Sequence, residues 1–414
     1  MNRIANVARP AAATRARVDG TRTLALHVLH VRHHTSFSGG GQVAEIVGAL
    51  GRRVDGAAPR QIQRTDRILF SRCFDEPAKA LCDGRLGFAG GLGSRKLARM
   101  ALDHFVSQVH LKNFYSPALG GRMYAVRKSD GKCFTPNAES VCRIEEGSTN
   151  AYLTHDRLIE ELLTGIEPKY NAAAKKLAAG EIDPECIYPI AAFAAYIMTC
   201  SPAAMRIQSA PLKAMVESTA RALDAADAFP PPPAALGSGR LTELLRSGKI
   251  KVTVDPKYPQ VIGIAYILRM ALTFANSAWD ILKNPFDDCP FFTSDFPAAI
   301  EESADPRVLN RIVPLTPNLA VRIRPDISLK RDELDFTFEY FRYRLYEIER
   351  EELDAINSLL AQCAEDLVFY HDDFPWVKPF IMKYASFRIE THTQELGTHE
   401  SALLVSRQRI VDHG

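Results

Sequence analysis

The chain contains 414 residues, of which 46% are hydrophobic and 24% are charged, and its formal net charge is +2 at pH 7, values typical of a globular protein with a substantial core. Its eight cysteines form no Cys-x-x-Cys pair and no short secreted framework, so reduced thiols in a cytoplasmic protein are the simplest interpretation. The longest largely apolar run, Tyr188 to Cys200, holds 13 residues, too few to cross a bilayer, so we expect no membrane partner.

Charge divides the chain at about residue 100. Residues 1–100 contain 15 Arg and 2 Lys against 7 acidic residues, whereas the remainder contains 34 basic and 42 acidic residues. Scattered Arg among Ala and Gly is typical of a reading frame extended upstream in GC-rich DNA, so we expect residues 1–99 to be a poorly ordered basic leader and Met100 to be the true start. The alternative is a basic arm that binds nucleic acid through its phosphates. The acidic balance of the remainder does not indicate nucleic-acid binding.

Patterns after residue 100 predict a β-hairpin followed by helices. Residues 122–127 alternate in polarity, and a turn at 129–132 separates them from a second strand at 133–135. Apolar spacing and turn residues then predict three helices, over residues 158–177, 189–200 and 203–226.

The second half of the chain mixes helical and extended patterns. A proline-rich connection at 229–239 leads to an extended stretch at 250–254 and to a long apolar helix at 259–282 that carries Trp279. Further strands are expected at 289–293 and 319–323, and helices at 298–303 and 347–367.

These elements predict an α+β fold that is predominantly helical, with a small sheet formed by the N-terminal hairpin and C-terminal strands. We expect a single helix-rich domain over residues 100–392, followed by a polar tail at 393–414.

His104 and Gln108 are the first candidates for chemistry. They stand four residues apart, so they share a face in a helix and can also converge in a loop. A neutral imidazole serves as a general base or metal ligand, and an amide orients water or a carbonyl. In the competing interpretation, His104 braces the first element and Gln108 satisfies backbone groups.

Carboxylates on the first predicted helix form a second candidate group. Glu160, Glu161 and Glu167 lie there, and Glu160 and Glu167 share a face if the helix continues through Gly165. Such a pair can bind a divalent metal, the one cofactor that the pattern indicates, or act as acid and base. A solvated helix face has the same pattern.

Two turns carry the remaining candidates. Ser294 and Asp295 follow an apolar pair, in a place where a carboxylate at the rim of a sheet can meet substrate. Asp295 is alternatively the N-cap of the next helix. Arg206 follows a turn at Ser201 and either clamps a phosphate or carboxylate or locks two helix ends together.

The order of these motifs resembles the bacterial domain-of-unknown-function family 4238 over residues 104–369. That family opens with His-aromatic-Val-Pro-Gln-x-x-Leu-x-x-Phe, continues with a Glu-bearing helix and a Pro turn before Arg, and later has Thr-Ser-Asp-x-Pro and Pro-Leu-x-Pro motifs and an Asn-to-Ala spacing. The matching residues are His104, Phe105, Val106, Gln108, Leu111, Phe114, Glu160, Glu161, Glu167, Pro202, Arg206, Thr293, Ser294, Asp295, Pro297, Pro314, Leu315, Pro317, Asn357 and Ala364. Ser107 replaces the usual Pro, and Cys200 stands where Arg is common. The resemblance implies a helical α+β domain and supplies positions without a mechanism.

The polar members of this set predict a hydrolase-like enzyme of the phosphodiesterase or nuclease kind. Its site comprises the catalytic residues His104, Gln108, Asp295, Glu160 and Glu167 and the substrate-binding residues Arg206 and Ser294. In this hypothesis the imidazole is a general base or ligand, the amide orients substrate and the carboxylates complete the site. The alternative is a non-enzymatic binding or regulatory protein whose polar motifs brace turns and helix ends. It predicts that these side chains are buried and bonded to the backbone.

Overall fold

A computed structural model describes most of the chain after residue 101. The described residues are 10–18, 22–29, 36–38, 41–43, 102–153, 155–227, 229, 236–237, 239–329, 335–396 and 403–414, the first four segments as backbone only. Those four segments are strands, of which β1 (Pro10–Val18) pairs with β2 (Arg22–Leu29) and with β9 (Ile250–Thr253), and β3 (Ser36–Ser38) pairs with β4 (Gly41–Val43). The other residues of the expected leader, and most of the proline-rich connection, lie outside the described residues. The start at Met100 stays a prediction.

The expectation of a predominantly helical fold with a small sheet is wrong. The chain is built around a five-stranded mixed sheet in which the strand order is β12-β13-β14-β10-β15. Its strands are β10 (Ala278–Lys283), β12 (Ala299–Glu302), β13 (Leu309–Thr316), β14 (Leu319–Arg324) and β15 (Arg342–Glu347). Neighbours are antiparallel except β10 and β15, which are parallel.

Burial explains why sequence patterns underestimated this sheet. All residues of β13 except Thr316 are buried, so no alternation of polar and apolar residues marks the strand. Residues 298–303, expected as a helix, contain strand β12, in which Ala299 pairs with Ile312 of β13. Pairing with a buried strand therefore overrides the helical preference of this Ala- and Glu-containing segment.

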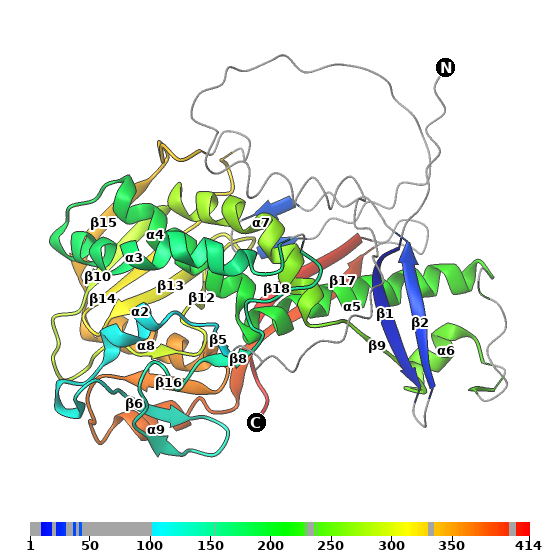
Figure 1. Ribbon diagram of the computed structural model, residues 1–414, viewed down its shortest axis with the longest axis horizontal. Coiled ribbons are helices and arrows are strands. Elements are labelled where there is room, and N and C mark those ends of the chain that lie inside the picture. Colours follow the sequence, from blue (N-terminus) through cyan, green and yellow to red (C-terminus); the bar gives the residue numbers. More distant parts are fainter. Residues whose placement is uncertain are drawn as a thin grey trace, which may run out of the picture.

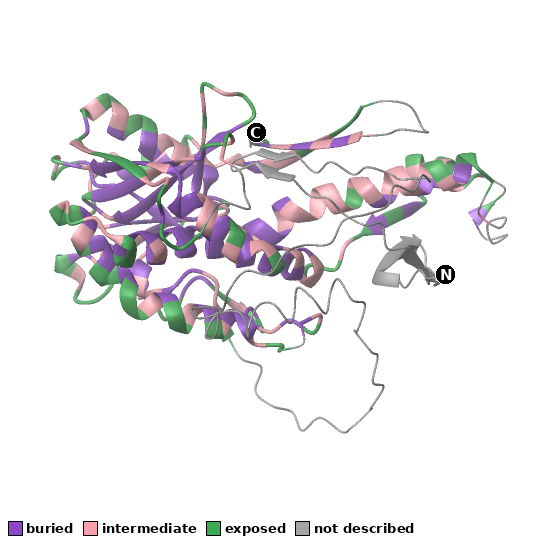
Figure 2. Cartoon of the chain, turned by 90° about the horizontal axis from the view of Figure 1, so that it is seen from above, coloured by how far each residue is buried: buried purple, intermediate pink, exposed green. Residues whose placement is uncertain are grey.

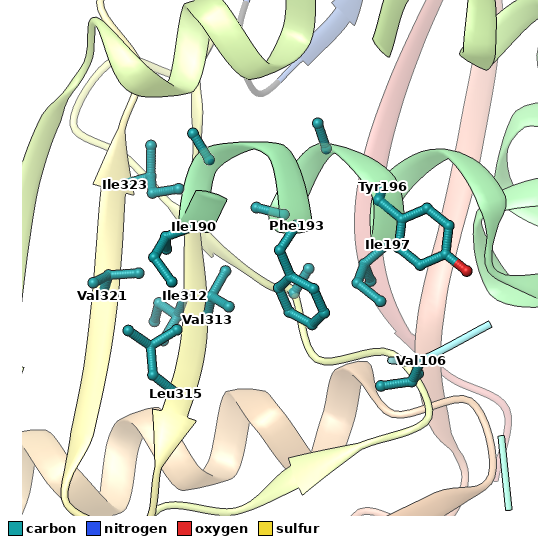
Figure 3. Close-up of a cluster of buried hydrophobic side chains, with 14 of the residues drawn as sticks. Val106, Ile190, Phe193, Tyr196, Ile197, Ile312, Val313, Leu315, Val321 and Ile323 are labelled. Atoms are coloured by element: carbon teal, nitrogen blue, oxygen red, sulfur yellow. The ribbon is translucent and has the colours of Figure 1, made fainter. Parts of the chain in front are cut away.

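Helices cover both faces of the five-stranded sheet (Figure 1). The helices concerned are α3 (Leu158–Ala179), α4 (Pro184–Cys200), α7 (Lys257–Ala275) and α8 (Arg350–Cys363). Figure 3 shows Phe193 of α4 among side chains that include Val321 of β14. The next residue, Arg322, bonds Glu352 of α8 instead. Because successive residues of a strand point to opposite faces, α4 and α8 pack on opposite sides. Buried residues are concentrated in this layered body (Figure 2).

Four predicted helices are confirmed, as α3, α4, α5 (Pro202–Ala225) and α8. Helices α4 and α5 meet at a 60° bend. At this bend the Ser201 side chain accepts a hydrogen bond from the Ala204 amide, which caps α5 and replaces helical bonds lost at the break.

The long helix expected at 259–282 ends early. In α7 the last residue is Ala275, after which the side chain of Asn276 donates to the Leu272 carbonyl and that of Ser277 to the Thr273 carbonyl. The chain then turns into β10, so Trp279 lies in a strand and not in the helix. Among the described helices α7 is by itself long and apolar enough to cross a membrane, and 56% of its apolar stretch is buried inside the protein.

A second sheet of four strands has the order β11-β16-β6-β7. The predicted hairpin is confirmed as β6 (Tyr124–Arg127) and β7 (Cys133–Phe134), and β6 pairs with β16 (Leu367–Tyr370), which in turn pairs with β11 (Thr293–Ser294). The described part of the expected polar tail belongs to another hairpin, formed by β17 (Phe387–Leu396) and β18 (Leu403–Asp412).

Shorter elements complete the described structure. They are β5 (Leu102–His104), β8 (Arg143–Glu145), α2 (Gln108–Leu111), α6 (Leu241–Arg246), α9 (Val377–Met382) and the 3-10 turns η1 (Lys112–Phe114) and η2 (Pro117–Leu119).

Candidate functional site

His104 and Gln108 lie on two different elements. His104 ends β5, and Gln108 begins α2 after Ser107, whose side-chain oxygen accepts a hydrogen bond from the Val109 amide and caps the helix. Gln108 Nε2 lies 3.4 Å from His104 Nδ1. The other ring nitrogen of His104, Nε2, is buried and has no hydrogen-bond partner among the described residues. The two side chains therefore converge across a turn and not along one helix face.

The backbone of His104 is held by α4. The hydroxyl of Tyr196 donates a hydrogen bond to the His104 carbonyl at 2.9 Å. Burial raises the pKa of Tyr196 well above its usual value, with smaller contributions from the charges of Cys200, Glu167 and Asp103. Glu167 lies on α3 and is partly exposed.

Glu160 is engaged by Arg157. The Arg157 Nε atom donates to Glu160 Oε2 at 2.8 Å, and its Nη2 atom bonds both Glu160 and, at 3.2 Å, Asp103. Glu161 is exposed, and α3 continues through Gly165. In the described part of the chain no group of three or more His, Cys, Asp or Glu side chains could hold a metal ion.

Asp295 binds the backbone of a distant segment. Its Oδ1 atom accepts the amide of Glu365 at 2.9 Å, and its Oδ2 atom accepts those of Asp366 and Leu367 at 2.8 Å each. Burial raises the pKa of Asp295 to about 6, although these three bonds act to lower it. The N-cap alternative for Asp295 is wrong, because the segment that follows forms β12 and not a helix. The neighbouring Ser294 hydroxyl accepts the amide of Phe296.

Lys128, which the sequence patterns did not single out, reaches the same segment. Its buried Nζ atom donates to the carbonyls of Ala361, Ala364 and Phe387 at 2.9, 2.8 and 2.6 Å. Burial lowers the pKa of Lys128 to about 8, although the charges of Asp295 and other nearby groups act to raise it. The ammonium group therefore satisfies carbonyls at the C-terminal end of α8, where a positive charge is favourable.

Arg206 joins this cluster from α5. Its Nε and Nη2 atoms each donate to one oxygen of Glu365 at 2.7 Å, its Nη1 atom donates to Glu390 at 3.0 Å, and Nη2 also donates to the Ile389 carbonyl at 2.8 Å. Glu365 connects Arg206 and Asp295. Arg206 binds the side chain of Glu365, and Asp295 accepts its backbone amide. Arg206 links α5 to β17 and to the end of α8.

His110 is a second residue that the sequence patterns missed. It is 0% exposed, its Nδ1 atom lies 2.7 Å from the Tyr170 hydroxyl, and its Nε2 atom lies 2.7 Å from Thr293 Oγ1. Burial lowers the pKa of His110 to about 3, so the ring is neutral. The ring also stacks on Phe193 at 4.9 Å between centroids. His110 therefore ties α2, α3 and β11 together. Its place between two apolar residues was the only sequence signal of a buried role.

The described site residues fall into two groups. One surrounds His104 and contains Gln108, and Glu160 adjoins it through Arg157 and Asp103. The other lies at the end of α8 and contains the side chains of Asp295, Arg206 and Lys128.

Comparison with known proteins returns one match. A family model described as a protein of unknown function (DUF4238) matches residues 103–374, more than half of the chain. No curated protein and no solved structure matches the chain.

Proposed function

This chain is a member of the DUF4238 family of proteins of unknown function, and we propose that it is a non-enzymatic binding protein whose polar motif residues stabilise the fold. The observation that carries the proposal is the bonding of Asp295, the carboxylate of the Thr-Ser-Asp-x-Pro motif. This bonding is what we expect of a protein whose motif residues stabilise the fold and whose partner binds elsewhere on the surface.

A catalytic carboxylate needs an oxygen atom that faces its substrate. Asp295 is 6% exposed, and both of its oxygens accept backbone amides at 2.8 to 2.9 Å. Leaving buried amides without an acceptor lowers the free energy of unfolding. This geometry therefore supports a role for Asp295 in holding residues 365–367 against β11.

Arg206 supports the same interpretation. A guanidinium that clamps an external phosphate presents two parallel N–H groups to it. In Arg206 two such groups, on Nε and Nη2, already bind the two oxygens of Glu365, and Nη1 binds Glu390. The side chain thus acts as a brace between α5 and the end of α8.

The test compares turnover with stability. The full-length chain and its Asp295→Asn variant are incubated with phosphodiester, nucleotide and ester substrates in Mg²⁺ or Mn²⁺, and thermal melting is measured alongside. We expect no turnover above the buffer rate from either protein. Metal-dependent turnover that is lost in Asp295→Asn while the melting temperature is unchanged would overturn the proposal.

A hydrolase is the second candidate, and His104 is the observation that favours it. Gln108 holds one nitrogen of the ring, and the other has no partner in the described part of the chain. Because Gln108 Nε2 can only donate, Nδ1 accepts from it and the neutral ring carries its proton on the unpartnered Nε2, so His104 acts as a general base only when the Gln108 amide is turned and its oxygen accepts from Nδ1.

This candidate has its own test. If His104 is a general base, His104→Ala lowers kcat/KM by about 10² to 10⁴ at an unchanged melting temperature. His155→Ala is the matched control, because His155 is an exposed histidine on the loop before α3. Equal activity of the two variants would exclude His104 as the base.

A further inference from the structure

The open edge of the five-stranded sheet carries an array of arginines. Asp280 of β10 is paired across the sheet with Arg322 of β14 on one side and with Arg344 of β15 on the other. Asp280 is 1% exposed, and its two oxygens accept hydrogen bonds from Nε and Nη2 of Arg344 at 2.8 and 2.9 Å. Arg322 is paired with Glu301 at 2.9 Å and with Glu352 at 2.8 Å. The charge of Arg322 is therefore matched within the protein.

The next row places two more arginines on the same face. Arg324 of β14 and Arg342 of β15 flank Ala278 of β10, two inter-strand spacings or about 10 Å apart at their Cα atoms. Arg324 shares the carboxylate of Asp280 at 3.0 Å. Arg342 is exposed, donates only to the carbonyls of Glu339 and Phe341, and forms no ion pair within the described ranges.

These contacts leave a positive excess at the edge. Arg324 and Arg344 share the single buried carboxylate of Asp280, which Arg322 also approaches at 3.7 Å, whereas Arg342 has no carboxylate partner in the described ranges. The side chains of Arg324 and Arg344 keep 38% and 61% of their surface exposed. Arg342 and Arg344 lie two residues apart on one strand, about 7 Å, which is comparable to the spacing of neighbouring phosphates in an extended nucleic acid strand.

Exposed aromatic rings accompany these arginines. Tyr343 follows Arg342 in the strand, points to the opposite face of the sheet and is 49% exposed, with one ring face stacked on Phe341 at 5.9 Å between centroids. Phe336, in the segment that leads into β15, is 48% exposed. Strand β15 is the last strand of its sheet in the described structure, so side chains from both of its faces border the open edge.

We propose that this edge binds single-stranded nucleic acid, with a phosphate on Arg342, the positive charges of the Asp280-bound Arg324 and Arg344 nearby, and a base stacked on Tyr343. The inference rests on the proposed binding function and names its partner. Guanidinium groups that follow a backbone, next to aromatic rings that accept any base, are the features by which proteins bind single strands. A duplex hides the base faces that Tyr343 would contact, and a polyglutamate-like acidic peptide has no flat ring to stack there. The acidic balance of residues 101–414 disfavours nucleic-acid binding over the surface at large, so the proposal is limited to this edge.

The test uses the full-length chain and a fluorescein-labelled oligothymidylate of about fifteen nucleotides, with binding followed by fluorescence anisotropy at several salt concentrations. We expect saturable binding that weakens as salt increases. Arg342→Glu should weaken binding about tenfold and reduce the salt slope by about one. Tyr343→Ala should weaken it by a similar factor, whereas Tyr343→Phe keeps the stacking ring and should retain the affinity.

Arg143→Glu is the matched control, because Arg143 is an exposed arginine on β8, away from this sheet edge (Figure 1). The inference is overturned if the wild-type chain does not bind the oligonucleotide, or if Arg143→Glu weakens binding as much as Arg342→Glu. Equal competition by a DNA duplex or by polyglutamate would also overturn it. If the chain neither binds the oligonucleotide nor turns over any substrate, this inference fails but the proposed non-enzymatic function does not. Cleavage of the bound oligonucleotide that disappears in His104→Ala would instead overturn that function.

Discussion

Lys128 and Asp295 bind opposite sides of the same turn of backbone. Lys128 donates to the carbonyls of Ala361 and Ala364, and Asp295 accepts the amides of the three residues that follow Ala364. The cation lies where α8 ends in unpaired carbonyls, and the anion lies where the next amides need acceptors. Together the two side chains fix the passage from α8 into β16.

Loss of the Lys128 contacts should destabilise the protein. In Lys128→Met the apolar stem is kept, but three buried carbonyls lose their donor, so we expect the free energy of unfolding to fall by about 2 to 3 kcal/mol. Urea denaturation measures the change. Lys132→Met, at an exposed turn position in the same hairpin, should change it by less than about 0.5 kcal/mol. Equal effects of the two substitutions would contradict the role of Lys128.

Asp295 should matter as an acceptor more than as a charge. Asp295→Ala leaves three buried amides unpaired and should cost about 3 kcal/mol. Asp295→Asn keeps one acceptor oxygen for the Asp366 and Leu367 amides and turns its NH2 group toward the Glu365 amide, so it should cost less than Asp295→Ala, because only one of the three bonds is lost. Guanidinium chloride denaturation at neutral pH ranks the variants. If Asp295→Asn is as unstable as Asp295→Ala, then the charge itself is required.

His110 should make stability depend on pH. Burial lowers its pKa in the folded protein to about 3, below the unfolded value of 6.5, so its contribution is present above pH 6.5 and is lost as pH falls toward 3. His110→Phe keeps the ring but leaves two buried hydroxyls unpaired, and should cost about 2 kcal/mol at pH 7. Below pH 6 this difference should shrink by up to about 1.4 kcal/mol per pH unit. A difference that is constant from pH 7 to pH 4 would show that His110 titrates normally in the fold.

Gly263 and Gly165 should respond oppositely to the same substitution. A Cβ atom on Gly263 of α7 would overlap the Thr199 side chain of α4, so Gly263→Ala should destabilise by about 1 to 3 kcal/mol. On Gly165 of α3 the same atom meets nothing within 4 Å, and Gly165→Ala should stabilise by about 0.5 to 1 kcal/mol. Thermal melting of the two variants checks both signs. A stabilising Gly263→Ala would mean that the α4 and α7 helices are not in close contact there.

Part of the candidate site was accessible from the sequence. Spacing predicted that His104 and Gln108 can converge, and they do, although through the turn at Ser107 and not through a shared helix. The motif around Asp295 was recognised, but its partners were not, because the amides that it binds lie 70 to 72 residues later in the chain. Lys128 resembled an exposed turn lysine, and only the packing of α8 against the hairpin shows it to be buried.

The sequence by itself determined those features that depend on neighbouring residues. Helices α3, α4 and α8 and the hairpin of β6 and β7 were predicted because their apolar spacing and turn residues are local, and the ordered motifs indicated the family. Only the tertiary structure decided the five-stranded sheet, since β13 is buried on both faces and has no alternating pattern. It also decided which polar groups meet, as Lys128 and Ala361 do across 233 residues, because such a bond gains its strength only where packing has excluded water.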